Sequence, residues 1–179
     1  MTSNTLKRHK RIRLDVGLYA QPGAICSVTL AVRDRQPIFA NPAVAKAAVE
    51  VLVERSDKTG VPVYGYCVMP DHIHIVLGPS ADCDIMTFVG QYKNLVQRAA
   101  WGLGVNGGFW QTGFWDRFLR AEEQVEQVVE YVLNNPIRRG LVDIGAIILF
   151  QGRWFFHYGA RAGDKPPRYR LVLLRQSNS

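Results

Sequence analysis

Apolar residues recur at helical spacing in three stretches of the chain. These stretches cover residues 42–59, 85–101 and about 122–135. Asn41 and Asp84 can cap the first two helices at their amino ends, and Gly60 and Gly102 follow at their carboxyl ends. Pro136 limits the third stretch. The spacing therefore predicts three amphipathic helices.

Segments that favour strands fill much of the chain between these helices. They cover residues 24–32, 61–69, 72–77 and 109–119, with weaker candidates at 144–150 and 153–158. Pro70-Asp71 separates the second segment from the third and suits a tight turn, which predicts a β-hairpin. The order β-α-ββ-α-β-α predicts an α+β fold, a ferredoxin-like sandwich whose antiparallel sheet has helices packed mainly on one face.

The composition is that of a globular protein. With 179 residues and a hydrophobic fraction of 47%, the chain suits one domain with decorated ends. No apolar run approaches the ~18 residues that span a bilayer, and the basic start lacks the apolar stretch of a secretory signal. Cys26, Cys67 and Cys83 form no CxxC motif. These features predict a cytoplasmic protein with no membrane contact, disulfide framework or zinc knuckle.

The net charge of +7 is divided unevenly along the chain. Residues 1–13 carry five basic side chains and no acidic one, and residues 151–179 carry six basic and one acidic. Residues 14–150 carry eleven basic and fourteen acidic side chains, so the central region is mildly acidic. Two interpretations stay open: the ends grip nucleic acid, or they are solvated tails that aid solubility.

His72 and His74 stand two positions apart in a predicted strand. A period of two places both on one face, together with Val76, and places the intervening isoleucines on the other. Neutral imidazoles that converge on one point suit a divalent cation, although such an ion needs a third ligand. The alternative is a pair of partly buried, hydrogen-bonded histidines with no ion.

Tyr131 and Asn135 lie one turn apart on the third predicted helix. The apolar stripe of that helix consists of Val125, Val128, Val129, Val132 and Leu133. At about 100° per residue, Tyr131 falls more than a right angle from the centre of the stripe, on the same side as Gln124 and Asn135. An Asn there can offer an amide oxygen to a hard cation. The alternatives are an edge aromatic whose hydroxyl reaches water, and an ordinary helix-end residue before Pro136.

Three segments, in this order, resemble one known family. They are GYCVMPDHIHIV at 65–76, FWQ and FWDRF within 109–118, and YVLNNPIRRGLV at 131–142. These look like the HUH motif region, the aromatic segment, and the nucleophile helix with its exit in HUH-type single-tyrosine transposases. Asn135-Pro136 is most similar to the REP-associated branch, which is tied to repetitive extragenic palindromes; the insertion-sequence branch more usually has Gln at position 135.

The resemblance covers about residues 20–145. It divides the chain into a basic tail (1–13), a transposase-like domain (14–145) and a basic, aromatic extension (146–179). It implies an enzyme that cleaves and rejoins single-stranded DNA, at or beside a hairpin, acting as a monomer or homodimer. Tyr131 would attack the phosphodiester to give a 5′-phosphotyrosine, while His72, His74 and Asn135 would hold Mg²⁺ or Mn²⁺.

DNA-contacting residues can be nominated on the same basis. The basic candidates are Lys93, Arg98, Arg117, Arg120, Arg138 and Arg139 in the domain, with Arg11 and Arg13 in the tail. Solvated surface charge is the alternative for each. Trp110, Phe114 and Trp115 are candidates for base stacking, against the alternative that they pack in the core.

Three other functions compete with the enzyme. A domesticated hairpin-binding protein would keep the fold without catalysis. A metal-dependent hydrolase of RNA or a nucleotide would use the histidines alone, and its activity would survive Tyr131→Phe. A basic structural or ribosome-associated module would be insensitive to His72→Ala.

Overall fold

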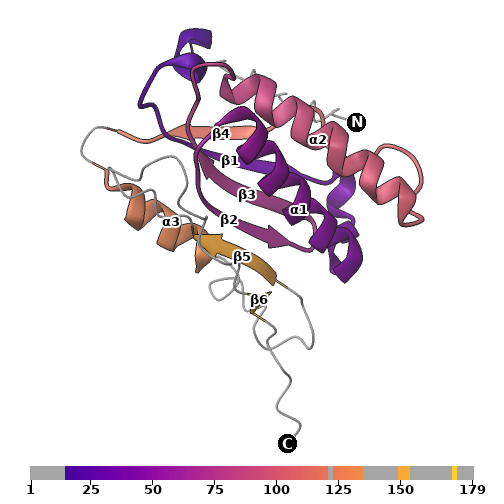
Figure 1. Ribbon diagram of the computed structural model, residues 1–179. Helices are drawn as coiled ribbons and strands as arrows, with labels where there is room; N and C mark the ends of the chain where they lie inside the picture. The colour runs from indigo at the N-terminus through magenta and orange to yellow at the C-terminus, as the bar shows by residue number, and fades with distance from the viewer. Residues whose placement is uncertain (1–14, 121–122, 135–148, 154–170, 173–179) are drawn as a thin grey trace, which may run out of the picture.

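The computed structural model describes residues 15–120, 123–134, 149–153 and 171–172 (Figure 1). Its helices are α1 (Pro42–Thr59), α2 (Ile85–Gly102) and α3 (Val125–Leu133). Its strands are β1 (Cys26–Ala31), β2 (Val63–Met69), β3 (His72–Leu77), β4 (Trp115–Phe118), β5 (Leu149–Arg153) and β6 (Leu171–Val172). Short 3₁₀ helices cover Val16–Ala20, Arg33–Arg35 and Ile38–Ala40.

The strands form one antiparallel sheet in the order β4-β1-β3-β2-β5-β6. Figure 1 shows α1 and α2 side by side over one face of this sheet, while α3 lies on the other. The predicted α+β sandwich with helices mainly on one face is therefore confirmed.

The amino ends of α1 and α2 and the carboxyl end of α1 follow the predicted capping residues, whereas α2 includes Gly102 and is capped by Leu103. The Asn41 side chain accepts a hydrogen bond from the backbone N–H of Ala43 at 3.0 Å, and Gly60 ends α1 with a φ of +66°. Asp84 accepts in the same way from the N–H of Thr87 at 2.8 Å. Each cap satisfies a backbone group that the helix itself leaves without a partner.

The third helix is shorter than predicted. It begins at Val125 rather than near residue 122, and Gln124 makes no side-chain capping bond. Glu123 instead bends the chain back, because its carboxylate accepts from the backbone N–H of Arg120 at 2.8 Å. The predicted end, Asn135, lies outside the described residues.

The hairpin of β2 and β3 is confirmed. Met69 pairs with His72 across Pro70-Asp71, so the turn has two central residues. A register shift between Val63 and Gly65 changes the alternation of β2.

Two strand predictions were wrong in extent. The segment 109–119 is not one strand: Trp110 makes an isolated bridge to Val32, Gly113 has a φ of +72°, and β4 covers only four residues. The Phe109 and Trp110 rings pack on Phe39 instead of continuing the ladder. Further on, β5 spans the predicted break between two strands, and residues 144–148 and 154–158 lie outside the described part.

Strand alternation divides the apolar side chains between two clusters. Ile73, Ile75 and Leu77 of β3 face the main core under α1 and α2. The second cluster lies under α3 and consists of Cys67, Met69, Val76, Val128, Val129 and Val132, with partly buried neighbours. His72 and His74 share the α3 face with Val76 because successive β3 residues point to opposite faces.

The three cysteines are buried and unbridged. Burial raises the pKa of Cys26 and of Cys67 to about 12, so both stay protonated thiols near neutrality. In the described residues, no helix has the length and apolar character needed to cross a membrane.

Candidate active site

The imidazoles of His72 and His74 meet edge to face on the α3 side of the sheet. Their Nε2 atoms lie 3.1 Å apart, and the ring planes are inclined at 88° with centroids 4.7 Å apart. His72 is only 1% exposed, whereas His74 is half-buried. The two nitrogens therefore converge at the turn end of β3.

Each ring is held at its other nitrogen. The Asp71 carboxylate lies 2.5 Å from His72 Nδ1, and Thr29 Oγ1 lies 2.9 Å from His74 Nδ1. Thr29 reaches His74 because the two are paired across β1 and β3. A carboxylate can only accept, so His72 Nδ1 carries a proton, and the neutral form of the ring presents a lone pair at Nε2.

Arg35 extends this chain of contacts. Its guanidinium donates to the second oxygen of Asp71 at 3.0 Å. Burial raises the pKa of the Asp71 carboxyl, but the hydrogen bonds and charges of His72 and Arg35 outweigh it and hold this pKa below its ordinary value. Asp34 and Arg35 have φ values of 54° and 55°, a backbone conformation uncommon outside glycine.

Sequence reasoning missed these supporting residues. The sequence places Asp71 in the predicted turn and in the segment that resembles the HUH motif region but gives it no role at the site, and it does not single out Thr29 or Arg35. Only for Asp71 did the sequence hold an indication, since it directly precedes His72.

The nitrogen pair fits a divalent cation. Two ligand atoms at right angles, each about 2.1 Å from an octahedral ion, lie about 3.0 Å apart, whereas tetrahedral zinc spreads them to about 3.3 Å. The observed 3.1 Å is compatible with two imidazole ligands of one divalent cation, and imidazole ligands suit Mn²⁺ better than Mg²⁺. Without an ion, the same spacing accommodates an N–H···N bond from His74 to His72, with Thr29 donating to His74.

Among the described residues, no His, Cys, Asp or Glu side chain joins the two histidines to make a group of three that could hold a metal ion. Asn135, the predicted third ligand, lies outside them. A third protein ligand would therefore be a residue of another type, such as Asn, or would come from the parts of the chain outside the described residues.

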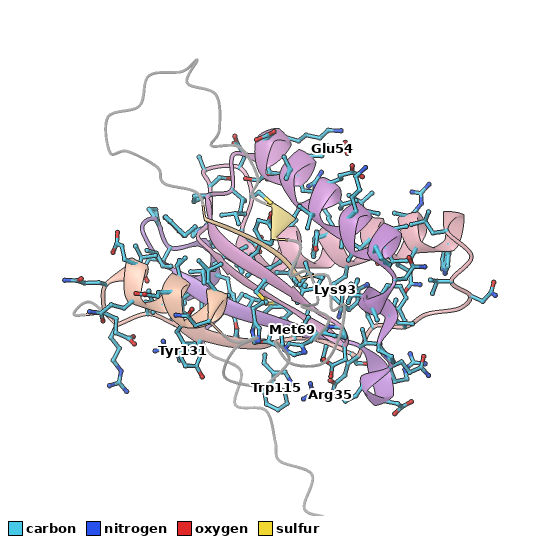
Figure 2. All side chains as sticks on the ribbon, turned by 90° about the horizontal axis from the view of Figure 1, so that it is seen from below. Arg35, Glu54, Met69, Lys93, Trp115 and Tyr131 are labelled. Carbon is cyan, nitrogen blue, oxygen red and sulfur yellow. The ribbon has the colours of Figure 1, made fainter. Side chains whose placement is uncertain are left out.

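Tyr131 lies on the same side of the sheet as the histidines. The helix that carries it is seated by Val128, Val129 and Val132, which pack on the second cluster. Tyr131 is on the flank of this buried stripe and is 56% exposed. Figure 2 shows its ring projecting beyond α3, on the side of the sheet where Trp115 also projects.

Two of the basic candidates have contacts within the protein. The Lys93 ammonium donates to the carbonyls of Gln111 and Gly113, both at 2.8 Å, and so braces the loop before β4. Arg117 donates to both oxygens of Glu123 at 2.7 and 2.9 Å.

Glu123 precedes α3 by two residues, so its contact with Arg117 of β4 fixes the chain just before the helix of Tyr131. The Arg120 backbone N–H, followed by the Arg117 side chain, holds the pKa of the Glu123 carboxyl below its ordinary value. Arg98 and Arg120 are exposed. Arg11, Arg13, Arg138 and Arg139 lie outside the described residues.

The three aromatic candidates differ in exposure. Trp110 is 9% exposed and its indole N–H donates to the Lys93 carbonyl at 2.9 Å. Phe114 is partly buried against the main core. Trp115 is 58% exposed. Core packing therefore accounts for Trp110 and Phe114 but not for Trp115.

Sequence comparison matches residues 23–135 to a family described as IS200-like transposase. A Haemophilus influenzae protein, provisionally named a REP-associated tyrosine transposase, is 24% identical over 89 residues, which are 44% of this chain and 51% of that protein. The chain thus spans about half the length of this curated relative.

Two solved structures are similar. One is a REP-associated tyrosine transposase bound to a REP hairpin, with a TM-score of 0.57 and 20% identity over 68% of this chain and 72% of that one. The other, from Deinococcus radiodurans and provisionally described as a transposase, has a TM-score of 0.47 and 21% identity over 62% and 88%. The first likeness supports the fold. Because the family match extends over more than half of the 179 residues, the chain belongs to the IS200-like transposase family.

Proposed function

We propose that this protein cleaves and rejoins single-stranded DNA beside a hairpin, by transesterification through a 5′-phosphotyrosine. Family membership supports DNA processing, and the similar structure that holds a REP hairpin supports hairpin DNA as the substrate class. The observation that carries the proposal is the convergence of two Nε2 atoms at 3.1 Å, each ring being anchored through Nδ1.

His72, His74 and Asn135 would hold a divalent cation, Mn²⁺ or Mg²⁺. Such an ion neutralises charge on the oxygens of the scissile phosphate and so favours attack at phosphorus. Asp71 and Thr29 keep the two rings oriented, and outer contacts of this kind matter to metal affinity nearly as much as the ligands.

Tyr131 would supply the nucleophile. Its hydroxyl loses a proton and bonds to phosphorus, the bond from phosphorus to the 3′ oxygen breaks, and that oxygen takes up a proton. The products are a 5′-phosphotyrosine and a free 3′ hydroxyl, and attack by a 3′ hydroxyl reverses the step. Because one phosphoester replaces another, rejoining needs no nucleoside triphosphate. The hydroxyl proton has to pass to a base or to water as the tyrosine oxygen attacks phosphorus.

The charge distribution supports a division of tasks along the chain. The domain at 14–145 carries the reaction, and Lys93, Arg98, Arg117, Arg120, Arg138 and Arg139 are its proposed phosphate contacts. The basic segments at 1–13, with Arg11 and Arg13, and at 146–179 add a salt-sensitive grip that does not depend on sequence.

A covalent capture experiment tests the proposal. The protein is incubated with Mn²⁺ and labelled DNA hairpins whose single-stranded flanks are randomised, and adducts that survive denaturing gels are counted and sequenced. We expect an adduct from wild type and none from Tyr131→Phe. His72→Ala should bind the hairpin but form no adduct.

Other outcomes favour the competing functions. Hairpin binding without any wild-type adduct would indicate a domesticated binding protein. Metal-dependent cleavage that survives Tyr131→Phe would indicate a hydrolase that uses the histidines alone.

The same assay distinguishes a monomeric site from a shared one. Tyr131→Phe and His72→Ala are mixed before the DNA is added. Adduct formation by the mixture means that a dimer places the tyrosine of one chain at the histidines of another. A mixture as inactive as its components means that each chain acts alone.

A further inference from the structure

The exposed indole of Trp115 shares a sheet face with the histidine pair. Trp115 on β4 pairs with Thr29 on β1, and Thr29 pairs in turn with His74 on β3. Residues directly paired across strands point to the same face, so all three side chains lie on the α3 side. Two strand spacings, about 10 Å, therefore separate the Trp115 backbone from that of His74.

Among the described residues, α3 covers only the neighbouring part of this face. The apolar stripe of α3 packs over residues of β2 and β3, namely Cys67, Met69 and Val76. On β4 the Trp115 side chain is 58% exposed, and that of Arg117, two residues along, is 56% exposed. In addition, β4 is an edge of the sheet. More than half of the Trp115 surface is thus accessible to a ligand that approaches the histidines from outside.

We propose that Trp115 stacks on an unpaired base of the DNA strand whose phosphate is bound at His72 and His74. The inference rests on the proposed function and adds a base-binding subsite to it. Indole rings bind every base through its π-face without hydrogen-bond readout, so this subsite takes unpaired nucleotides of any sequence. Paired bases are already stacked on each other, and the subsite therefore favours single-stranded flanks over duplex.

The chain provides a matched control in Trp101. This tryptophan is 52% exposed, nearly as much as Trp115, but it lies on α2, which covers the opposite face of the sheet. Its indole N–H donates to the Gly107 carbonyl at 2.8 Å. A general effect of removing a surface indole should therefore be equal at the two positions, whereas a subsite at the histidines affects only one.

The test is binding of fluorescein-labelled oligothymidylate, followed by fluorescence anisotropy at several salt concentrations. Trp115→Ala should weaken binding about tenfold. The slope of affinity against salt should stay unchanged, because stacking releases no counterions. Trp115→Phe should recover most of the loss, and Trp101→Ala should bind as wild type does. Wild-type affinity in Trp115→Ala, or an equal loss in both alanine variants, overturns the inference.

A second measurement needs no substitution. Oligothymidylate carrying 5-iodouracil is irradiated with the wild-type protein, and the cross-linked peptide is identified by mass spectrometry. We expect the Trp115 peptide; cross-links confined to other peptides contradict the subsite. Failure of the proposed function gives a different result: the wild-type protein then forms no covalent adduct with hairpin DNA, whether or not Trp115 contributes to binding of oligothymidylate.

Discussion

The two faces of the sheet are closed in different ways. On one face, two eighteen-residue helices bury a continuous apolar layer that includes Phe39, Phe88 and Tyr92. On the other, the nine-residue α3 covers a smaller cluster and leaves Tyr131 and Trp115 more than half exposed. Among the described residues, the candidate catalytic side chains of His72, His74 and Tyr131 lie on the second face.

Desolvation explains the difference. Polar groups are costly to bury unless each is hydrogen-bonded, so the fully covered face holds mainly side chains without such needs. His72 is buried on the partly covered face because Asp71 and His74 satisfy both of its nitrogens. We infer that the face under α1 and α2, the closed face, supplies most of the folding free energy. The face under α3, the open face, supplies the site.

The largest expected effect tests the closed face. Phe88 is fully buried and stacked near Tyr92, with centroids 6.5 Å apart. Phe88→Ala should lower the free energy of unfolding by about 3–5 kcal/mol, measured by urea denaturation. On the face under α3, Tyr131→Phe removes only a hydroxyl from a side chain that is 56% exposed, and it should cost less than about 0.5 kcal/mol. Similar losses in the two variants would contradict the division between faces.

The next largest effect is expected on the affinity for Mn²⁺. Asp71→Asn keeps the shape but removes the charge that orients and polarises His72. Loss of an outer partner of this kind lowers metal affinity by about 10–100-fold, which isothermal titration with Mn²⁺ can measure. Arg35→Gln leaves the carboxylate in place and should lower affinity less. An unchanged Mn²⁺ affinity in Asp71→Asn would mean that the His72 ring needs no charged partner at Nδ1.

A smaller loss is expected at the other histidine. Thr29→Val removes the hydroxyl that lies 2.9 Å from His74 Nδ1 while keeping a similar volume. A neutral hydroxyl polarises an imidazole less than a carboxylate does, so Mn²⁺ affinity should fall less than in Asp71→Asn. If Thr29→Val loses more Mn²⁺ affinity than Asp71→Asn does, then the hydrogen bond at His74 Nδ1 matters more for metal binding than the one at His72 Nδ1.

Local sequence predicted most of the closed face and only part of the open one. The caps at Asn41 and Asp84 and the alternation of β3 depend on near neighbours in the chain, and they were confirmed. The Thr29–His74 contact depends on the register between β1 and β3, which no local pattern encodes. The length of β4 was overestimated for a similar reason, since Trp110 packs in the core rather than extending the strand.

The smallest expected effect compares how readily the two faces open. Cys26 lies in the main core and Cys67 under α3; both are fully buried, and both have a pKa of about 12. Both thiols are buried and protonated in the folded state, so a reagent reaches either one only after an opening exposes it. At one pH, a difference in labelling rate therefore reports how often each region opens.

Single-cysteine variants, with the other two thiols replaced by alanine, are followed with a thiol reagent under native conditions. Cys67 should react faster than Cys26, because α3 is short, lacks a side-chain cap and is seated mainly by three valines. Raising the pH should speed both reactions, since more thiolate forms at each opening. If the two thiols react at the same rate, α3 opens only when the whole domain unfolds, and the helix of Tyr131 is as firmly held as the main core.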